Sequence, residues 1–315
     1  MPRNRHAHER TRSNEIAESA APRRVVSCVS GCGGGSVGAR AAVRRTDRGH
    51  AACRWGGASN ASDPTAAAAP STSDDDLVKK TQNPVSDLIS VPFQFNLSFP
   101  SGNDDDGQLI VNIQPVIPIS LNEDWNLIAR TILPVIYLPS PVASLDDESG
   151  IGDLQFTAFA SPKESGEWIW GVGPVLRFPT ASEDILGSEQ WSAGPSAVVL
   201  RMDGPWVYGA LFQHVWSFAG DDDRSHVSET LIQPFVNYNL PDGWYLTASP
   251  VITYNWAADD SDDALTLPIG GGFGKVHRFG NMPVNLQIQA FHNTVRPDDA
   301  PEWTVRFQVQ LLFPK

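Results

Sequence analysis

A strict alternation of apolar and polar residues near the C-terminus places the strongest constraint on how this chain can fold. Trp303, Val305, Phe307, Val309, Leu311 and Phe313 alternate with Thr304, Arg306, Gln308 and Gln310. A period of two puts successive side chains on opposite faces of a β-strand. Segments 88–99 and 283–294 show the same alternation. These segments therefore predict strands with one apolar face and one polar face.

The polar positions distinguish a membrane barrel from a soluble β-sandwich. They hold mostly Gln, Asn, Ser and Thr, whereas a water-facing sheet would be rich in Lys and Glu. Neutral hydrogen-bonding side chains suit a narrow, partly hydrated interior. The sequence has no run of about 18 apolar residues, which excludes a transmembrane helix, but a barrel strand needs only about 9–11 residues. The pattern favours a transmembrane barrel whose apolar face meets lipid.

Twelve such strands are predicted in the second part of the chain, and an even number suits a single-chain bacterial barrel. The predicted fold is all-β, an antiparallel up-and-down transmembrane β-barrel. Its strands are expected at 88–99, 108–121, 126–138, 153–162, 168–180, 193–202, 206–219, 229–240, 244–257, 264–277, 283–294 and 302–313.

The connections between these strands alternate between short and long, as in outer-membrane barrels with short periplasmic turns and longer external loops. Both ends of the barrel segment are then expected on the periplasmic side. The short turns are 122–124, 163–167, 203–205, 241–243 and 279–281, and the long loops are 101–107, 139–152, 181–192, 220–228, 258–263 and 295–301.

Tryptophan and proline mark recurring positions in this pattern. Trp125, Trp168, Trp206 and Trp244 each follow a short turn, which predicts an aromatic girdle at the periplasmic membrane interface. Proline argues against regular strands because it removes a hydrogen bond of the ladder. Seven prolines nevertheless lie in mid-strand, and we expect bulges in the wall there: Pro115, Pro134, Pro174, Pro195, Pro234, Pro250 and Pro268.

Residues 1–80 differ from residues 81–315, which we assign to the barrel. The first part carries 13 Lys and Arg against 8 Asp and Glu, and it holds all three cysteines. The second part carries 10 Lys and Arg against 28 Asp and Glu. The first part shows no hydrophobic periodicity and no apolar core of signal-peptide length. We expect a disordered segment, or a misassigned start that hides the true signal peptide.

The sequence offers little support for catalysis, cofactors or nucleic-acid binding. A formal net charge of −13 disfavours a nucleic-acid partner. Histidines lack the spacing of a zinc hydrolase, and residues 81–315 contain no Gly-x-Ser-x-Gly motif of the serine-hydrolase type. Gly270–Gly274 lacks the Lys-Ser/Thr that follows a phosphate loop. We expect a non-enzyme without a cofactor.

Charged and amide side chains on the polar register are the candidate lumen residues. Arg130, Arg177 and Arg306 could favour anions or pair with an acid, for which Asp153 is a candidate. The other lumen-facing candidates are Gln308 and Gln310. Acidic clusters fall in the long loops, where they either keep the loops soluble or bind divalent cations that bridge to lipopolysaccharide.

Several stretches resemble a family of Gram-negative outer-membrane proteins. The family is catalogued as meta-pathway phenol-degradation proteins or transporters, also under the label "neuromedin U". The resemblance covers residues 80–315 and is carried by Thr81-Gln82-Asn83-Pro84, Asn112–Pro118, Leu121–Ile128, Gln233–Leu246 and Arg306–Gln310.

The resemblance implies a porin-like barrel in contact with outer-membrane lipid and lipopolysaccharide. It further implies transport: a passive channel or transporter for small molecules, including aromatic or hydrophobic ones. The alternative is a non-conducting barrel with a structural or surface-interaction role. The family's phenol label identifies no substrate.

Overall fold

The computed structural model describes residues 74–99, 107–139, 147–298 and 300–314. Its elements are α1 (Asp74–Thr81), β1 (Ile89–Phe99), β2 (Gln108–Ile113), β3 (Val116–Ser120), β4 (Trp125–Leu138), β5 (Glu148–Ile151), β6 (Leu154–Pro162), β7 (Trp168–Phe178), η1 (Asp184–Leu186), β8 (Gln190–Asp203), β9 (Trp206–Gly220), β10 (Ser228–Asn239), η2 (Pro241–Gly243), β11 (Trp244–Ala248), β12 (Ile252–Asn255), β13 (Leu265–Phe279), β14 (Met282–Val295) and β15 (Trp303–Phe313).

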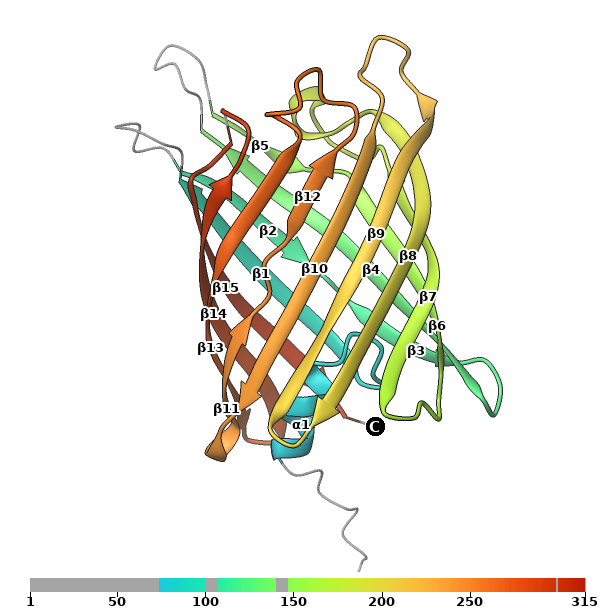
Figure 1. Ribbon diagram of the computed structural model, residues 1–315, viewed down its shortest axis with the longest axis vertical. Coiled ribbons are helices and arrows are strands. Elements are labelled where there is room, and N and C mark those ends of the chain that lie inside the picture. Colours follow the sequence, from blue (N-terminus) through green and yellow to red (C-terminus); the bar gives the residue numbers. More distant parts are fainter. Residues whose placement is uncertain (1–73, 100–106, 140–146, 299, 315) are drawn as a thin grey trace, which may run out of the picture. The chain divides into compact units, whose positions relative to one another are not determined.

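The strands form one closed antiparallel barrel (Figure 1). Each strand pairs with its neighbours in sequence, and β1 closes the barrel by pairing with β15 over eleven residue pairs. The fifteen β-segments make twelve wall strands, because β2 and β3, β5 and β6, and β11 and β12 each form one interrupted strand. The predicted twelve-stranded barrel is confirmed.

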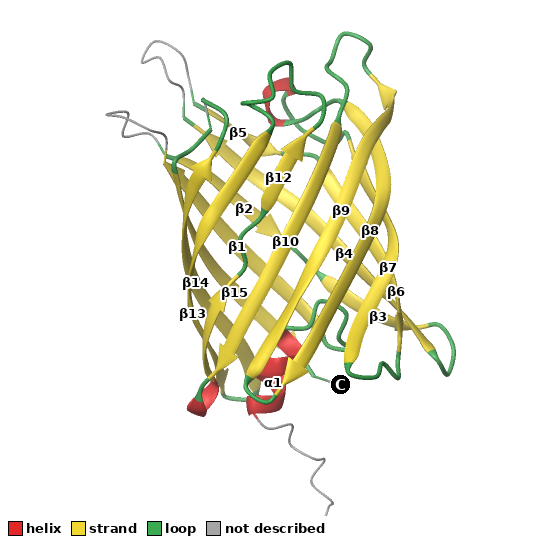
Figure 2. Ribbon diagram, viewed as in Figure 1, coloured by secondary structure: helices red, strands yellow, loops and turns green. Residues whose placement is uncertain are grey.

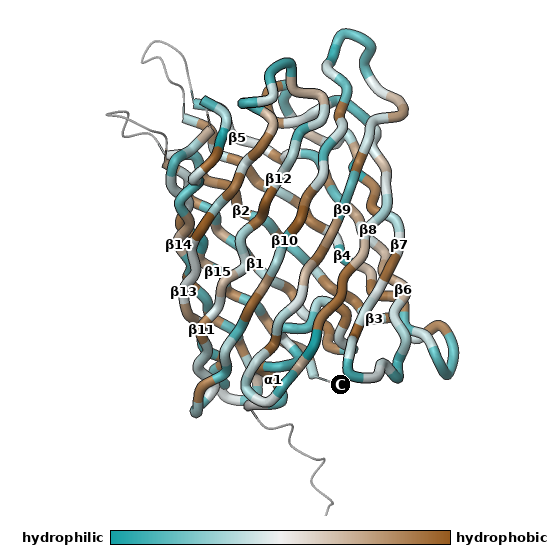
Figure 3. Tube along the Cα trace, in the orientation of Figure 1, coloured by the Kyte–Doolittle hydropathy of each residue, from teal (hydrophilic) through white to brown (hydrophobic). Residues whose placement is uncertain are grey.

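The apolar register of the end strands faces outward. On β1, Phe95, Leu97 and Phe99 are exposed on the outside, whereas Ser90 and Ser98 are buried within. The exposed outer positions are therefore hydrophobic, as the lipid-facing surface of a barrel requires. In Figure 3, hydrophobic and hydrophilic positions alternate along the strands, and most of the connections are hydrophilic. Figure 2 shows that the longer connections lie at the end opposite α1.

All seven mid-strand prolines lie where regular pairing with at least one neighbouring strand fails. Pro115 and Pro250 fall in the interruptions between β2 and β3 and between β11 and β12, and Pro268 lies at a register shift on β13. Pro174 and Pro195 face each other across β7 and β8, and each lies at a gap in the ladder to its other neighbour. The missing N–H of proline accounts for these breaks. Pro134 and Pro234 lie inside the continuous strands β4 and β10, and each faces the interruption of a neighbouring strand, between β5 and β6 and between β11 and β12.

Helix α1 packs inside one end of the barrel. Leu77 and Val78 are fully or almost fully buried, in a cluster with Tyr245, Val276 and Leu312. The helix ends with Lys79 and Lys80, which interact favourably with the negative end of the helix dipole. α1 therefore narrows the lumen at the end where the chain enters β1 (Figure 1).

A second apolar cluster fills the opposite inner wall at this end. It joins Val85, which follows α1, to inward side chains of β4, β6, β8, β9 and β10. The inward faces of these strands are thus largely apolar, whereas those of β14 and β15 carry mainly amides beside Phe291 and Leu312. The members are Val85, Ile128, Phe159, Val198, Leu200, Val207, Leu211 and Phe235.

Two predictions at the segment boundaries need correction. Residues 74–80 were expected to lack structure, yet they form α1, because a single apolar pair, Leu77 and Val78, suffices once the barrel supplies its partners. The prediction for residues 1–73 lies outside the described residues. The strand predicted from 153 begins earlier, as β5, which pairs with the end of β4 inside the predicted loop 139–152.

Candidate functional site

Two adjoining cavities occupy the lumen between α1 and the long loops. The cavity beside α1 has a volume of about 180 Å³, and the one toward the long loops about 480 Å³. They meet in a shared layer of five side chains from five different strands or their interruptions. These are Gln94, Gln114, Arg130, Leu211 and Gln233.

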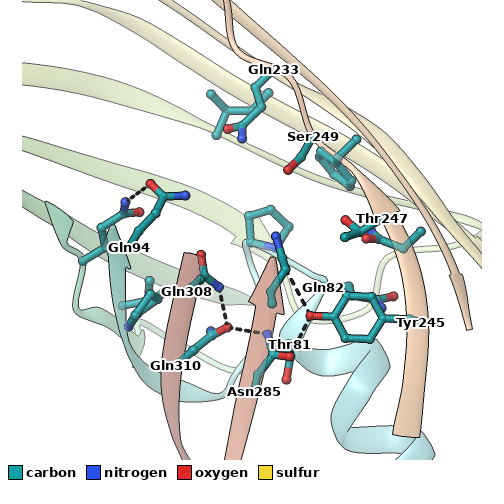
Figure 4. Close-up of a pocket in the computed structure, with 18 of the residues that line it drawn as sticks. Thr81, Gln82, Gln94, Gln233, Tyr245, Thr247, Ser249, Asn285, Gln308 and Gln310 are labelled. Carbon is teal, nitrogen blue, oxygen red and sulfur yellow. Dashed lines mark hydrogen bonds between the residues drawn. The ribbon is translucent and has the colours of Figure 1, made fainter. Parts of the chain in front are cut away.

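A hydrogen-bonded network lines the smaller cavity (Figure 4). The Tyr245 hydroxyl donates to Oδ1 of Asn285 at 2.7 Å, and Oε1 of Gln287 lies 3.1 Å away. Asn285 Nδ2 and Gln308 Nε2 both donate to Oε1 of Gln310, at 3.2 and 3.3 Å. Buried amides are costly unless they are hydrogen-bonded, so this network fixes the wall next to α1. The structure thereby places the predicted lumen residues Gln308 and Gln310 in this cavity.

Arg130 lies in the layer that the two cavities share. Its Nη2 donates to Oε1 of Gln114 at 2.8 Å, and Gln114 Nε2 donates in turn to Oε1 of Gln94 at 2.9 Å. Gln114 occupies the interruption between β2 and β3, and its side chain is buried. The chain of amides holds the guanidinium against the wall formed by β1 to β4.

Arg306 lines only the larger cavity. Its Nε donates to Oδ1 of Asn96 at 3.0 Å, and its Nη1 donates to the backbone oxygen of Ser249 at 3.1 Å. The guanidinium carbon lies 5.0 Å from the ring centroid of Phe291, within the range of a cation–π contact. Ser249 lies in the interruption between β11 and β12, so its backbone oxygen is available to a side chain.

The described walls of the two cavities carry arginine side chains and no acidic side chain that would neutralise them. Of the residues that the structure describes, no aspartate or glutamate lines either cavity, and neither Arg130 nor Arg306 forms an ion pair. An arginine side chain keeps its charge at any physiological pH. The two guanidinium groups therefore give the lumen a positive potential.

Arg177 and Asp153 lie at the long-loop end. Arg177 Nη2 is 3.5 Å from Oε1 of Glu229, and both line a separate depression of the mouth. Asp153 Oδ2 accepts hydrogen bonds from the backbone N–H and the hydroxyl of Ser188, each at 2.7 Å. The predicted pairing of Asp153 with an arginine is wrong, since its carboxylate holds the loop between β7 and β8.

The same mouth carries an acidic contact outside the membrane-spanning strands. The hydrogen bond that a protonated Glu189 donates to the carboxylate of Asp184 raises the pKa of Glu189 above its ordinary value, and desolvation and the negative charge of Asp184 act in the same direction. Arg224 opposes this shift, because its Nε lies 3.2 Å from Oε2 of Glu189.

An apolar strip faces the lumen and was not predicted from the sequence. Leu211, Leu231 and Val251 line the larger cavity together with Phe291. No sequence signal distinguishes this strip, because β9 carries apolar residues on both faces, with Leu211 inside and Phe212 outside. Tyr245 and Gln114 were also missed, since an isolated tyrosine or glutamine has no distinctive pattern.

The four predicted girdle tryptophans lie at one end of the wall. Trp168, Trp206 and Trp244 are each between 41% and 47% exposed on the outer surface, and Trp125 is half-buried. Each contacts an aromatic ring of another strand, with centroid distances from 4.7 to 6.3 Å. Trp244 follows η2, which contacts α1, so Trp244 lies at the end of the barrel that holds the helix.

Neither a metal cluster nor a membrane-spanning helix occurs in the described part of the chain. No three His, Cys, Asp or Glu side chains gather there to hold a metal ion. No described helix has the length and apolarity to cross a membrane. Of the acidic loop clusters, Asp104–Asp106 lie outside the described residues.

A solved outer-membrane protein shares this fold. An outer-membrane channel from Pseudomonas putida F1 is 18% identical and superimposes with a TM-score of 0.56, covering 72% of this chain and 94% of its own. The NanC porin is 9% identical, with a TM-score of 0.47, covering 72% of this chain and 100% of its own. No curated protein matches in sequence.

The closed barrel, its apolar outer band and the shared fold place the protein in the bacterial outer membrane. Residues 98–311 match a family described as "Putative MetA-pathway of phenol degradation". The match spans more than half of the chain and nearly the whole barrel. The chain belongs to this family of outer-membrane β-barrel proteins.

Proposed function

We propose that the protein is a passive outer-membrane channel for small solutes, including aromatic or hydrophobic ones. The observation that carries the proposal is the shared layer of the two cavities, because it joins the space beside α1 to the space below the long loops. The lining combines amides with an apolar strip, which suits small solutes of mixed polarity. We propose no catalytic role.

The lumen is narrow, which favours a selective path over a general pore. Twelve strands lie between the eight of barrels filled by side chains and the sixteen to eighteen of open porins. α1 and the apolar cluster around Phe159 and Leu200 occupy much of the end nearest the helix. Passage therefore runs between these two packed regions.

Recordings of the full-length protein in planar lipid bilayers test this function. We expect discrete current steps after insertion, with a small unit conductance. Insertion is verified independently by the shift in gel mobility between unboiled and boiled samples of the same vesicles. Verified insertion without current steps, together with no solute flux into liposomes, would contradict the proposal.

The alternative is a non-conducting barrel with a structural or surface-interaction role. One observation favours it: α1 is packed into the lumen with Leu77 and Val78 buried, as a plug would be. The same recordings decide between the two, because a permanent plug abolishes current and flux together.

We further propose interfacial roles for residues outside the lumen. Trp125, Trp168, Trp206 and Trp244 would anchor the barrel at the periplasmic headgroups, where the ring is buried in lipid and the indole N–H meets water. The acidic long loops would contact lipopolysaccharide, with divalent cations bridging carboxylates to its phosphates.

A further inference from the structure

The lining of the larger cavity carries positive charge, although residues 81–315 as a whole have a net negative charge. Residues 81–315 carry 28 acids against 10 Lys and Arg, yet the described cavity lining includes two arginines and no acid. The lining is otherwise composed of neutral side chains. A solute inside this cavity therefore experiences a positive potential that the acidic loops do not cancel at short range.

Arg130 has hydrogen-bond donors that no described residue satisfies. Its Nη2 donates to Gln114, whereas its Nε and Nη1 have no acceptor within the described part of the barrel. A guanidinium carries five N–H donors, and unsatisfied donors in a confined space are costly. Arg130 lines both cavities, so an anion bound beside it can accept from these donors. Arg306 differs, because both Asn96 and Ser249 engage it.

The apolar strip favours a ligand that carries an apolar group beside its anionic group. Leu211 lies in the same layer as Arg130, and Leu231 and Val251 continue the strip within the larger cavity. A small inorganic anion gains nothing from such a surface, whereas an apolar group is stabilised in proportion to the apolar area that it buries. A volume of about 480 Å³ accommodates a ring with one substituent.

We propose that the larger cavity binds a small organic anion with an apolar body, of the class of aromatic carboxylates and phenolates. Its anionic group accepts hydrogen bonds from the free donors of Arg130, and its apolar body contacts Leu231 and Val251. Arg306 contributes positive potential from across the cavity. This assignment names the substrate class of the channel and so rests on the proposed function.

Equilibrium binding tests the site without requiring conduction. The full-length protein in detergent is titrated calorimetrically with benzoate, its neutral analogue benzamide, its cationic analogue benzylammonium, and acetate. We expect saturable binding of benzoate about tenfold or more tighter than that of the other three, because a hydrogen bond to a charged group contributes about 1.5–3 kcal/mol. Benzoate binding no tighter than that of benzamide or benzylammonium would overturn the assignment.

Three variants locate the bound anion. Arg130→Gln should weaken benzoate binding about tenfold or more. Leu231→Gln should weaken benzoate but leave acetate unchanged, since acetate has little apolar surface. Arg201→Gln is the matched control, because Arg201 lies on the outer wall beside Trp168 and Glu167 and should leave binding intact. An equal loss in Arg130→Gln and Arg201→Gln would place the anion elsewhere.

Bilayer recordings with benzoate separate this inference from the proposed function. Current steps without any preference for anions, and without block by benzoate, would leave the channel intact and overturn the anion site. Specific benzoate binding without conduction would support the site and overturn the channel. Anion-selective current that benzoate blocks, with selectivity reduced in Arg130→Gln, supports both.

Discussion

Gln114 bonds through its side-chain oxygen to Nη2 of Arg130, at 2.8 Å. The contact depends on a break in the wall, because Gln114 lies where β2 ends and Pro115 prevents regular pairing. The backbone N–H of Gln114 donates a hydrogen bond of 2.9 Å to the carbonyl oxygen of Pro92. The side chain of Gln114 is buried in the lumen. An interruption of the barrel wall thus positions the charged group of the site.

This relationship predicts the effect of Gln114→Glu. A carboxylate in place of the amide oxygen would form an ion pair with Arg130 and neutralise the charge of the shared layer. We expect benzoate affinity to fall about tenfold, since the guanidinium is then engaged by an acid. The measurement is calorimetric titration, with Asn122→Asp in the exposed turn before β4 as the control. Unchanged affinity in Gln114→Glu would mean that Arg130 does not contact the anion.

The two faces of β15 predict opposite responses to a positive charge. Val309 pairs with Phe93 on the lipid side, and Gln310 is buried in the lumen. Val309→Lys should cost about 2–4 kcal/mol near the bilayer midplane. Gln310→Lys should cost less, because it loses only the bonds to Asn285 and Gln308. Refolding into lipid vesicles under a urea gradient measures both, and equal losses would contradict the face assignment.

Docking of α1 predicts how the lumen can be widened. Leu77→Ala should remove about 2–5 kcal/mol of packing free energy from the helix, because Leu77 is fully buried. We expect a higher unit conductance and faster proteolysis before residue 89, with the barrel still heat-modifiable. Lys80→Gln is the control, since its exposed ion pair with Asp87 spans 3.9 Å and contributes at most about 1 kcal/mol. A conductance unaffected by Leu77→Ala would show that α1 does not limit the path.

The buried hydroxyl of Tyr245 predicts a loss of stability in Tyr245→Phe. Removing it leaves Oδ1 of Asn285 without its donor inside the network, at a cost of about 1–3 kcal/mol. Urea unfolding in detergent should show the shift. Tyr208→Phe provides the comparison, because Tyr208 lies against Trp168 on the outer wall. If both variants were equally stable, the network around Asn285 would contribute nothing to the wall.

Sequence periodicity predicted the wall well because a barrel exposes one face of each strand to lipid. The alternation on β1, β14 and β15 located these three strands to within a residue or two. Trp206 and Trp244 are the first residues of two other strands, β9 and β11. The exceptions share one cause. β5 and α1 are short elements that gain stability from partners distant in sequence, namely the end of β4 and the Tyr245 cluster.

Prediction of the lumen was less complete, because chemistry there depends on which side chains meet across the barrel. Arg130 and Arg306 could be proposed from the polar register, but their partners Gln114 and Asn96 could not. The sequence suggests Asp153 as a partner for an arginine, yet Ser188, 35 residues later, engages its carboxylate. The strip around Leu231 remained hidden, since both faces of β9 and parts of both faces of β10 are apolar.

The position of α1 has a consequence for the order of assembly. Leu77 and Val78 pack with Leu312, which lies on the last strand, so the helix cannot reach its site before the whole chain has been synthesised. The seam between β1 and β15 joins residues more than 200 positions apart, and contacts of such sequence separation form slowly. Seating of the helix and closure of the seam are therefore late and coupled events. The N-terminal helix therefore reaches its final position only after the C-terminal strand is in place.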